Sequence, residues 1–96
     1  MAYSIIFDPN VNLEVTDQID WYNSKSKGLG FRFYKNLQNQ IVTISKNPYL
    51  FANKYKSTRV SYLKIFPFAI YYIIFEETNS VLILAILHTS RKPLDI

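Results

Sequence analysis

His88 is the single histidine of the chain, and an imidazole can act as acid or base near neutral pH. Arg91 follows three residues later, so a phosphate bound there would meet an imidazole and a guanidinium together. A lone histidine that closes an apolar strand is, however, more often a hydrogen-bonded structural residue. The residues alone leave both interpretations of His88 open.

Basic residues in the middle of the chain form a second candidate site. Arg59 can bind a phosphate through its planar fork, or it can tie a strand to the helices. Lys54, Tyr55 and Lys56 alternate charge with an aromatic ring, which suits a nucleic-acid backbone or the carboxylates of a protein partner. We expect a basic binding surface made of Lys54, Lys56, Arg59, Arg91 and Lys92.

The distribution of charge says more than the net charge of +4. No acid occurs between Asp20 and Glu76, an interval that contains nine lysines and arginines. Such a block attracts phosphate backbones or an acidic protein. The plain alternative is a solvated surface that keeps an apolar protein in solution.

Composition excludes several classes of protein. With one histidine and no cysteine the ligands for zinc are missing, and the glycines follow no strand, as a phosphate-binding loop would require. We therefore predict no metal and no cofactor. The longest apolar run, residues 66–75, is shorter than the ~20 residues of a membrane helix, and no segment resembles a signal peptide. We expect a single domain over residues 1–96, in the cytoplasm.

The elements that must position these residues follow the order β-α-α-β-β-β. Asp8 and Pro9 are typical of a helix start, and Pro48 of a helix end. Residues 49–58 are expected to form a loop. The strands and helices are expected at 2–7, 9 to about 25–28, 29 or 30 to 47, 59–65, 68–75 and 81–88. This order predicts an α+β domain whose helical hairpin packs on one face of a mostly antiparallel four-stranded sheet.

The last two strands are apolar on both faces. Alternation places successive side chains on opposite faces, and it groups His88 with Leu82 and Leu84. Two helices can cover one face only, and each large apolar side chain left in water forfeits roughly 1.5–3 kcal/mol. We therefore expect a partner over the second face, which is represented by Tyr71, Ile73, Leu82 and Leu84.

A series of short motifs, in order along nearly the whole chain, resembles the RelE/ParE superfamily of toxins from bacterial type II toxin-antitoxin pairs. The motifs are Trp21-Tyr22, Gly28-Leu29-Gly30, Arg32-Phe33, Asn47-Pro48, Arg59, Phe66-Pro67-Phe68 with Ile70 and Tyr72, and finally His88, Arg91 and Pro93. The resemblance implies a small toxin that is neutralised by a cognate antitoxin. That antitoxin would be the partner over the second face of the sheet.

The superfamily divides in mechanism. RelE-like members are ribosome-dependent mRNA endonucleases, whereas ParE-like members inhibit DNA gyrase by binding. RelE-like nucleases place an arginine early in the strand that matches 68–75, where this chain has Ala69. If the chain is a nuclease, the resemblance assigns catalysis to Arg59, Lys64, His88 and Arg91. We favour a ParE-like toxin that acts by binding, with DNA gyrase as the candidate target; the alternatives are an mRNA endonuclease or a degenerate, non-toxic member.

Overall fold

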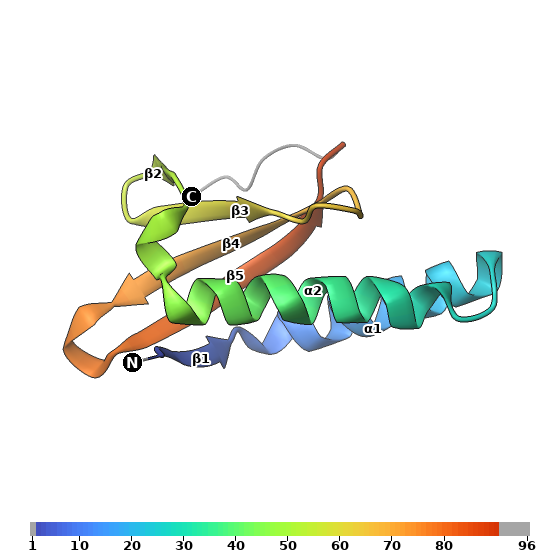
Figure 1. Cartoon of the computed structure of the whole chain (residues 1–96), viewed down its shortest axis with the longest axis horizontal. Helices are drawn as coiled ribbons and strands as arrows, with labels where there is room; N and C mark the ends of the chain where they lie inside the picture. Colours follow the sequence, from blue (N-terminus) through green and yellow to red (C-terminus); the bar gives the residue numbers. More distant parts are fainter. Residues whose placement is uncertain (1, 91–96) are drawn as a thin grey trace.

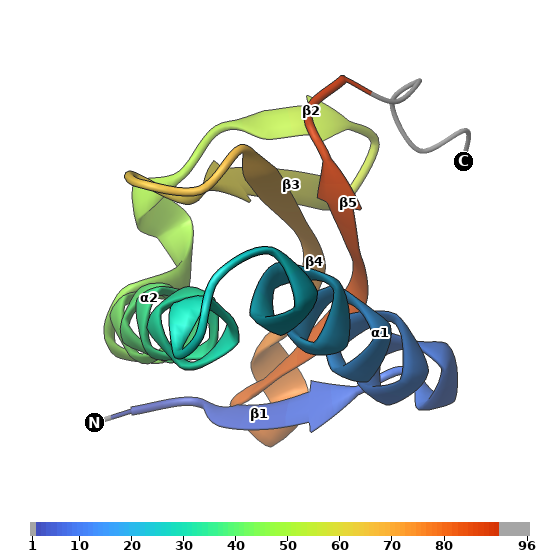
Figure 2. The same ribbon diagram turned by 90° about the vertical axis from the view of Figure 1, so that its right-hand side faces the viewer.

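A computed structural model describes residues 2–90, which form two layers: a five-stranded sheet and a helical hairpin over one of its faces (Figures 1 and 2). The elements are β1 (Ser4–Phe7), α1 (Pro9–Lys25), α2 (Leu29–Lys46), the 3₁₀ turn η1 (Pro48–Leu50), β2 (Asn53–Tyr55), β3 (Thr58–Tyr62), β4 (Phe68–Phe75), the 3₁₀ turn η2 (Glu76–Thr78) and β5 (Ser80–His88). The predicted α+β class and the hairpin on one face are confirmed.

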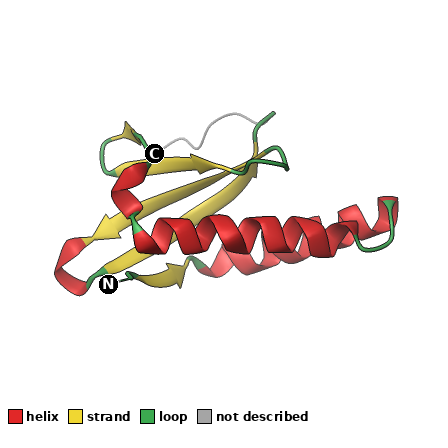
Figure 3. Cartoon of the chain, in the orientation of Figure 1, coloured by secondary structure: helices red, strands yellow, loops and turns green. Residues whose placement is uncertain are grey.

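The sheet has five strands in the order β1-β5-β4-β3-β2, and not the four that were predicted. β1 runs parallel to β5, and the other pairs are antiparallel, so the sheet is mixed. The strand missed by the sequence analysis is β2, which lies within the predicted loop 49–58 (Figure 3). Its three residues are all exposed, so the alternation of buried and exposed side chains that marks a strand is missing.

The hairpin is fixed by local signals at its ends. Asp8 caps α1, because its carboxylate accepts a hydrogen bond from the Asn10 backbone N–H at 3.1 Å, and Pro9 opens the helix. Gly28 precedes α2 with a φ of +81°, a conformation that glycine adopts at little cost. The helices pack tightly at Gly30, where an added Cβ would lie only 2.7 Å from the Asn23 side chain.

The core lies between the hairpin and the face of the sheet that it covers. α1 and α2 contribute Val11, Tyr22, Phe33, Leu37 and Ile44; β4 and β5 contribute Phe68, Ile70, Tyr72, Val81, Ile83 and Ile86. Each of these side chains is at most 8% exposed. Burial of one such side chain contributes roughly 1.5–3 kcal/mol, so this layer supplies most of the favourable packing of the fold.

A β-bulge divides β5 into two halves that face differently. Tyr71 pairs with Ala85 and Tyr72 pairs with Ile83, so Leu84 is an extra residue opposite the β4 ladder. Residues after the bulge therefore exchange faces relative to strict alternation. Ile86 and His88 lie opposite Ile70 and Phe68 on the helix-covered face, and the predicted grouping of His88 with Leu82 is wrong.

Neither helix among residues 2–90 is long and apolar enough to cross a membrane.

Candidate functional site

The uncovered face of the sheet is apolar and partly exposed. Tyr71, Ile73 and Leu82 share this face, since Tyr71 pairs with Ala85 and Ile73 with Leu82. These three side chains and that of the bulge residue Leu84 are neither fully buried nor fully exposed. Smaller residues between them, such as Val60 and Ala85, are buried. The chain therefore seals this face in part, and its large apolar side chains remain accessible to a partner.

The predicted basic residues fall into separate groups. Lys54 and Lys56 lie in the β2–β3 hairpin, where the Lys56 Nζ sits 5.4 Å from the centre of the Tyr55 ring. Lys64 lies beyond the opposite end of β3, in the connection to β4. Arg91 and Lys92 lie outside the described residues.

Arg59 is engaged within the protein. Its guanidinium donates a hydrogen bond to the Phe51 carbonyl at 2.7 Å and stacks 5.0 Å from the centre of the Tyr49 ring. Tyr72 supports the same segment, because its hydroxyl donates to the Pro48 carbonyl at 2.6 Å. Both contacts hold η1 and the following loop against the sheet, so the internal partners of Arg59 lie in this segment and not in the helical hairpin.

His88 closes β5 on the helix-covered face. Its ring packs edge-on against Phe68 with 5.2 Å between the ring centres, and its Nδ1 accepts the Ser90 backbone N–H at 3.1 Å. The Ser90 hydroxyl oxygen lies 2.7 Å from the same nitrogen. Glu14 and Asp17 of α1 line the cleft beside the ring. The imidazole therefore shares this cleft with two carboxylates of α1.

A tyrosine cluster that the sequence analysis missed joins the start of β1 to both 3₁₀ turns. The Tyr3 hydroxyl donates to the Glu76 carboxylate at 2.6 Å, and this bond raises the pKa of Tyr3 to about 12. Burial raises the pKa of the neighbouring Tyr49 hydroxyl, which also interacts with Glu76. Seventy-three positions separate Tyr3 from Glu76, so no local pattern in the sequence could have indicated this contact.

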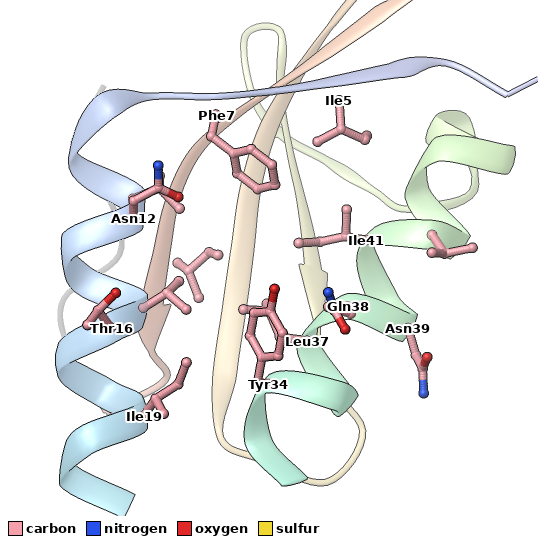
Figure 4. A pocket seen from close by; sticks show the side chains of 14 residues that line it. Ile5, Phe7, Asn12, Thr16, Ile19, Tyr34, Leu37, Gln38, Asn39 and Ile41 are labelled. Atoms are coloured by element: carbon pink, nitrogen blue, oxygen red, sulfur yellow. The ribbon is translucent and has the colours of Figure 1, made fainter. Parts of the chain in front are cut away.

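A groove of about 690 Å³ runs between the two helices (Figure 4). α1 forms one wall with Asn12, Thr16 and Ile19, and α2 forms the other with Tyr34 and Gln38. β1 crosses one end of the groove, where Ile5 and Phe7 are directed toward the gap between the helices (Figure 4). This groove was not predicted from the sequence, because its lining combines residues of both helices with Ile5 and Phe7 of β1 and Ile86 of β5, which only the fold brings together.

No group of three or more histidine, cysteine or acidic side chains within residues 2–90 could hold a metal ion.

Comparison with known proteins identifies the family. Residues 5–93 match the family model described as the ParE toxin of the type II toxin-antitoxin system parDE. No curated protein sequence matches the chain significantly. Among solved structures, the chromosomal ParDE toxin-antitoxin system of P. aeruginosa superposes with a TM-score of 0.77 at 13% identity, over 91% of this chain and 96% of that one.

Two structures from E. coli show the same fold. The isolated RelE toxin has a TM-score of 0.69 at 16% identity, over 95% of this chain and 88% of that one. The intact RelBE toxin-antitoxin complex has a TM-score of 0.69 at 19% identity, over 94% and 100% of the two chains.

Proposed function

The chain belongs to the ParE toxin family of type II toxin-antitoxin systems, and from this premise we propose that it arrests growth by binding a cytoplasmic target, with DNA gyrase as the candidate, and that a cognate antitoxin neutralises it. We favour binding over RNA cleavage. The main support is the distance along the sheet between Arg59 and His88, two residues that a nuclease of this family would need.

The backbones of Arg59 and His88 are well separated on the sheet, which disfavours joint action on one phosphate. Arg59 pairs with Tyr72 and His88 with Phe68, on opposite sides of β4 and four residues apart along it. At ~3.3 Å per residue and ~4.8 Å per strand, their backbones are about 13 Å apart along the sheet and about 10 Å apart across it. In-line cleavage needs its catalytic groups within about 3–3.5 Å of the reacting atoms.

The contacts of both side chains support the same conclusion. The Arg59 guanidinium is turned toward the Phe51 carbonyl and the Tyr49 ring. The cleft beside His88 contains Asp17 and Glu14, whose negative charge repels a phosphate. These contacts support a structural role for His88.

The antitoxin is assigned to the uncovered face of the sheet. Tyr71, Ile73 and Leu82 offer accessible apolar area there, and burial of apolar area drives most protein association. The basic hairpin with Lys54 and Lys56 adds a positively charged rim that suits carboxylates of the antitoxin or a phosphate backbone.

Expression of the chain alone in a bacterial host tests the proposal. We expect growth arrest accompanied by double-strand DNA breaks that disappear in a host whose gyrase resists poisoning. Co-expression of the short open reading frame next to the gene for this chain should restore growth. Normal growth, with folded protein detected in the cells, would contradict the proposal and favour a degenerate member.

A further inference from the structure

β1 is an edge strand whose outer backbone groups have no partner in the fold. The strand order places it at one margin of the sheet, beside β5 alone (Figure 2). The backbone N–H groups of Ser4 and Asp8 donate to carbonyls of β5 and of the turn before it, at 2.9 Å each. Because the backbone groups of a strand alternate in direction, those of Ile5 and Phe7 point away from β5. Within residues 2–90, no backbone hydrogen bond occupies this outer side of the two residues.

The two edges of the sheet differ in their protection against further strand pairing. The opposite edge strand, β2, has an irregular register and contains Lys54, and Lys56 follows in the turn. Lysines and irregular pairing are features that keep edge strands from joining other strands. β1 has no charged residue over positions 3–7, where Ile6 is 49% exposed and Phe7 is 40% exposed. An open, uncharged edge with accessible apolar side chains is suited to another strand.

The unused groups of β1 favour one register for pairing with a second copy of the chain. When two antiparallel copies meet with Ile6 opposite Ile6, each Ile5 lies opposite Phe7 of the other copy, and only unused donors and acceptors are needed. A register centred on Ile5 requires the Tyr3 N–H, which already donates to a carbonyl of α2 at 2.8 Å. A register centred on Phe7 requires an N–H from Pro9, which has none.

We propose that β1 pairs with β1 of a second copy around a twofold axis at Ile6, so that the two sheets become one. Ile6 lies on the uncovered face of the sheet, because it is aligned with Leu82 of β5. The pairing therefore places two exposed isoleucines against each other on that face. Like charges do not meet, since Asp8 of each copy lies opposite Ser4 of the other. Self-complementarity of this kind is what a twofold interface requires.

The contact is small, so the dimer is weak. It consists of about four backbone hydrogen bonds and the side chains of residues 5–7, which is less than the ~1,200 Å² of a stable interface. We expect a monomer at low micromolar concentration and a dimer toward millimolar concentration. The inference goes beyond the proposed function, because it depends on neither the target nor the antitoxin.

Single cysteines test the register directly, because the chain has none of its own. Ile6→Cys places the two Cα atoms about 4.5 Å apart, which a disulfide can span. Ser4→Cys, an exposed position of the same strand, places them about 14 Å apart, which is too far. Ile65→Cys is a control at a 70% exposed position between β3 and β4. Under mild oxidation of the full chain, Ile6→Cys should cross-link at least about tenfold faster than either control.

Sedimentation of cysteine-free variants tests the contact without a cross-link. Ile6→Lys places like charges directly opposite each other and should weaken the dimer at least about tenfold. Ile65→Lys makes the same substitution with the same change in net charge, away from the edge, and should change the dimer about twofold or less. Circular dichroism verifies that both variants are folded.

Several results would overturn the inference. They are a native chain that stays monomeric up to about 1 mM, equal cross-linking of the three cysteine variants, or a dimer that Ile6→Lys leaves intact. If the chain alone is monomeric and an extended segment of the antitoxin shifts the backbone signals of Ile5 and Phe7, that segment occupies the edge and the proposed dimer is wrong. The growth and DNA-break assays report on the target, so the two proposals fail separately.

Discussion

Tyr72 and Arg59 show how single side chains fix the segment between the layers. The Tyr72 hydroxyl reaches the Pro48 carbonyl from a fully buried ring, and Arg59 reaches the Phe51 carbonyl. The sequence analysis placed Arg59 correctly on a strand but left its role open, because a guanidinium serves a phosphate and a carbonyl equally well. The positions of Phe51 and Tyr49 favour the carbonyl, since both residues contact the guanidinium.

The buried hydroxyl of Tyr72 makes a measurable prediction. Tyr72→Phe leaves the Pro48 carbonyl without its donor and should lower the free energy of unfolding by about 1–2 kcal/mol, measured by urea denaturation. Tyr62→Phe, on an exposed tyrosine of β3, should change it by less than about 0.5 kcal/mol. Equal stability of the Tyr72 variant and the native protein would contradict the assigned hydrogen bond.

The same hydroxyl predicts a dependence on pH. Burial raises the pKa of Tyr72 to about 12, above its value of about 10 in the unfolded chain. The neutral form is therefore favoured by folding, and its contribution is complete below pH ~10 and is lost as the pH rises toward ~12. Unfolding free energies measured across this window should fall, and less steeply in Tyr72→Phe. Tyr3 contributes to the fall in both proteins, because its pKa is also raised to about 12.

His88 is predicted to matter for stability and not for toxicity. His88→Ala removes the contact with Phe68 and the acceptor of the Ser90 N–H, and should cost about 1–2 kcal/mol of stability. Growth arrest should persist once folding is verified by circular dichroism. Complete loss of arrest in a folded His88→Ala protein would favour the nuclease alternative.

At the scale of elements, both helices and four of the five strands could be predicted because each carries its own periodic pattern and end signals. Asp8, Pro9 and Pro48 marked the helix boundaries to within a residue or two. β2 and the bulge at Leu84 could not be predicted. β2 is short, and all of its residues are exposed. The bulge lies in a strand that is apolar on both faces, so the extra residue does not disturb an alternation of polar and apolar side chains that the sequence could have shown.

The close approach of the helices predicts a large effect at Gly30. Gly30→Ala would press a methyl group against the Ile19 carbonyl and the Asn23 amide, and should cost about 1–3 kcal/mol as the hairpin shifts. Arg32→Ala, at an exposed position of the same helix, should change stability by less than about 0.5 kcal/mol. Thermal unfolding of the two variants would settle the comparison, and equal melting temperatures would contradict the tight crossing.

At the scale of the whole molecule, the described residues leave two apolar surfaces accessible, the outer face of the sheet and the groove between the helices. Such surfaces are covered by partners in proteins that function in complexes. The isolated chain should therefore self-associate or precipitate at high concentration, and a bound antitoxin should prevent this. Sedimentation that shows a stable monomer at millimolar concentration would contradict the expectation.

The need for a partner could be inferred from the sequence, because one hairpin cannot cover two apolar faces. The location of the groove could not, since it depends on how the helices diverge from their crossing at Gly30. The target also lies beyond sequence reasoning. Arg59, Lys64, His88 and Arg91 are present although Ala69 stands where RelE-like nucleases place an arginine, and it is the pairing of the strands that sets Arg59 apart from His88.

Mapping of RNA 5′ ends tests the central claim most directly. The purified chain is added to a bacterial translation extract, and new ends on the translated message are located by primer extension. A toxin that acts by binding leaves the message intact, and that is the predicted result. Cuts phased with the codons, present with the native chain and absent with His88→Ala, would contradict the account.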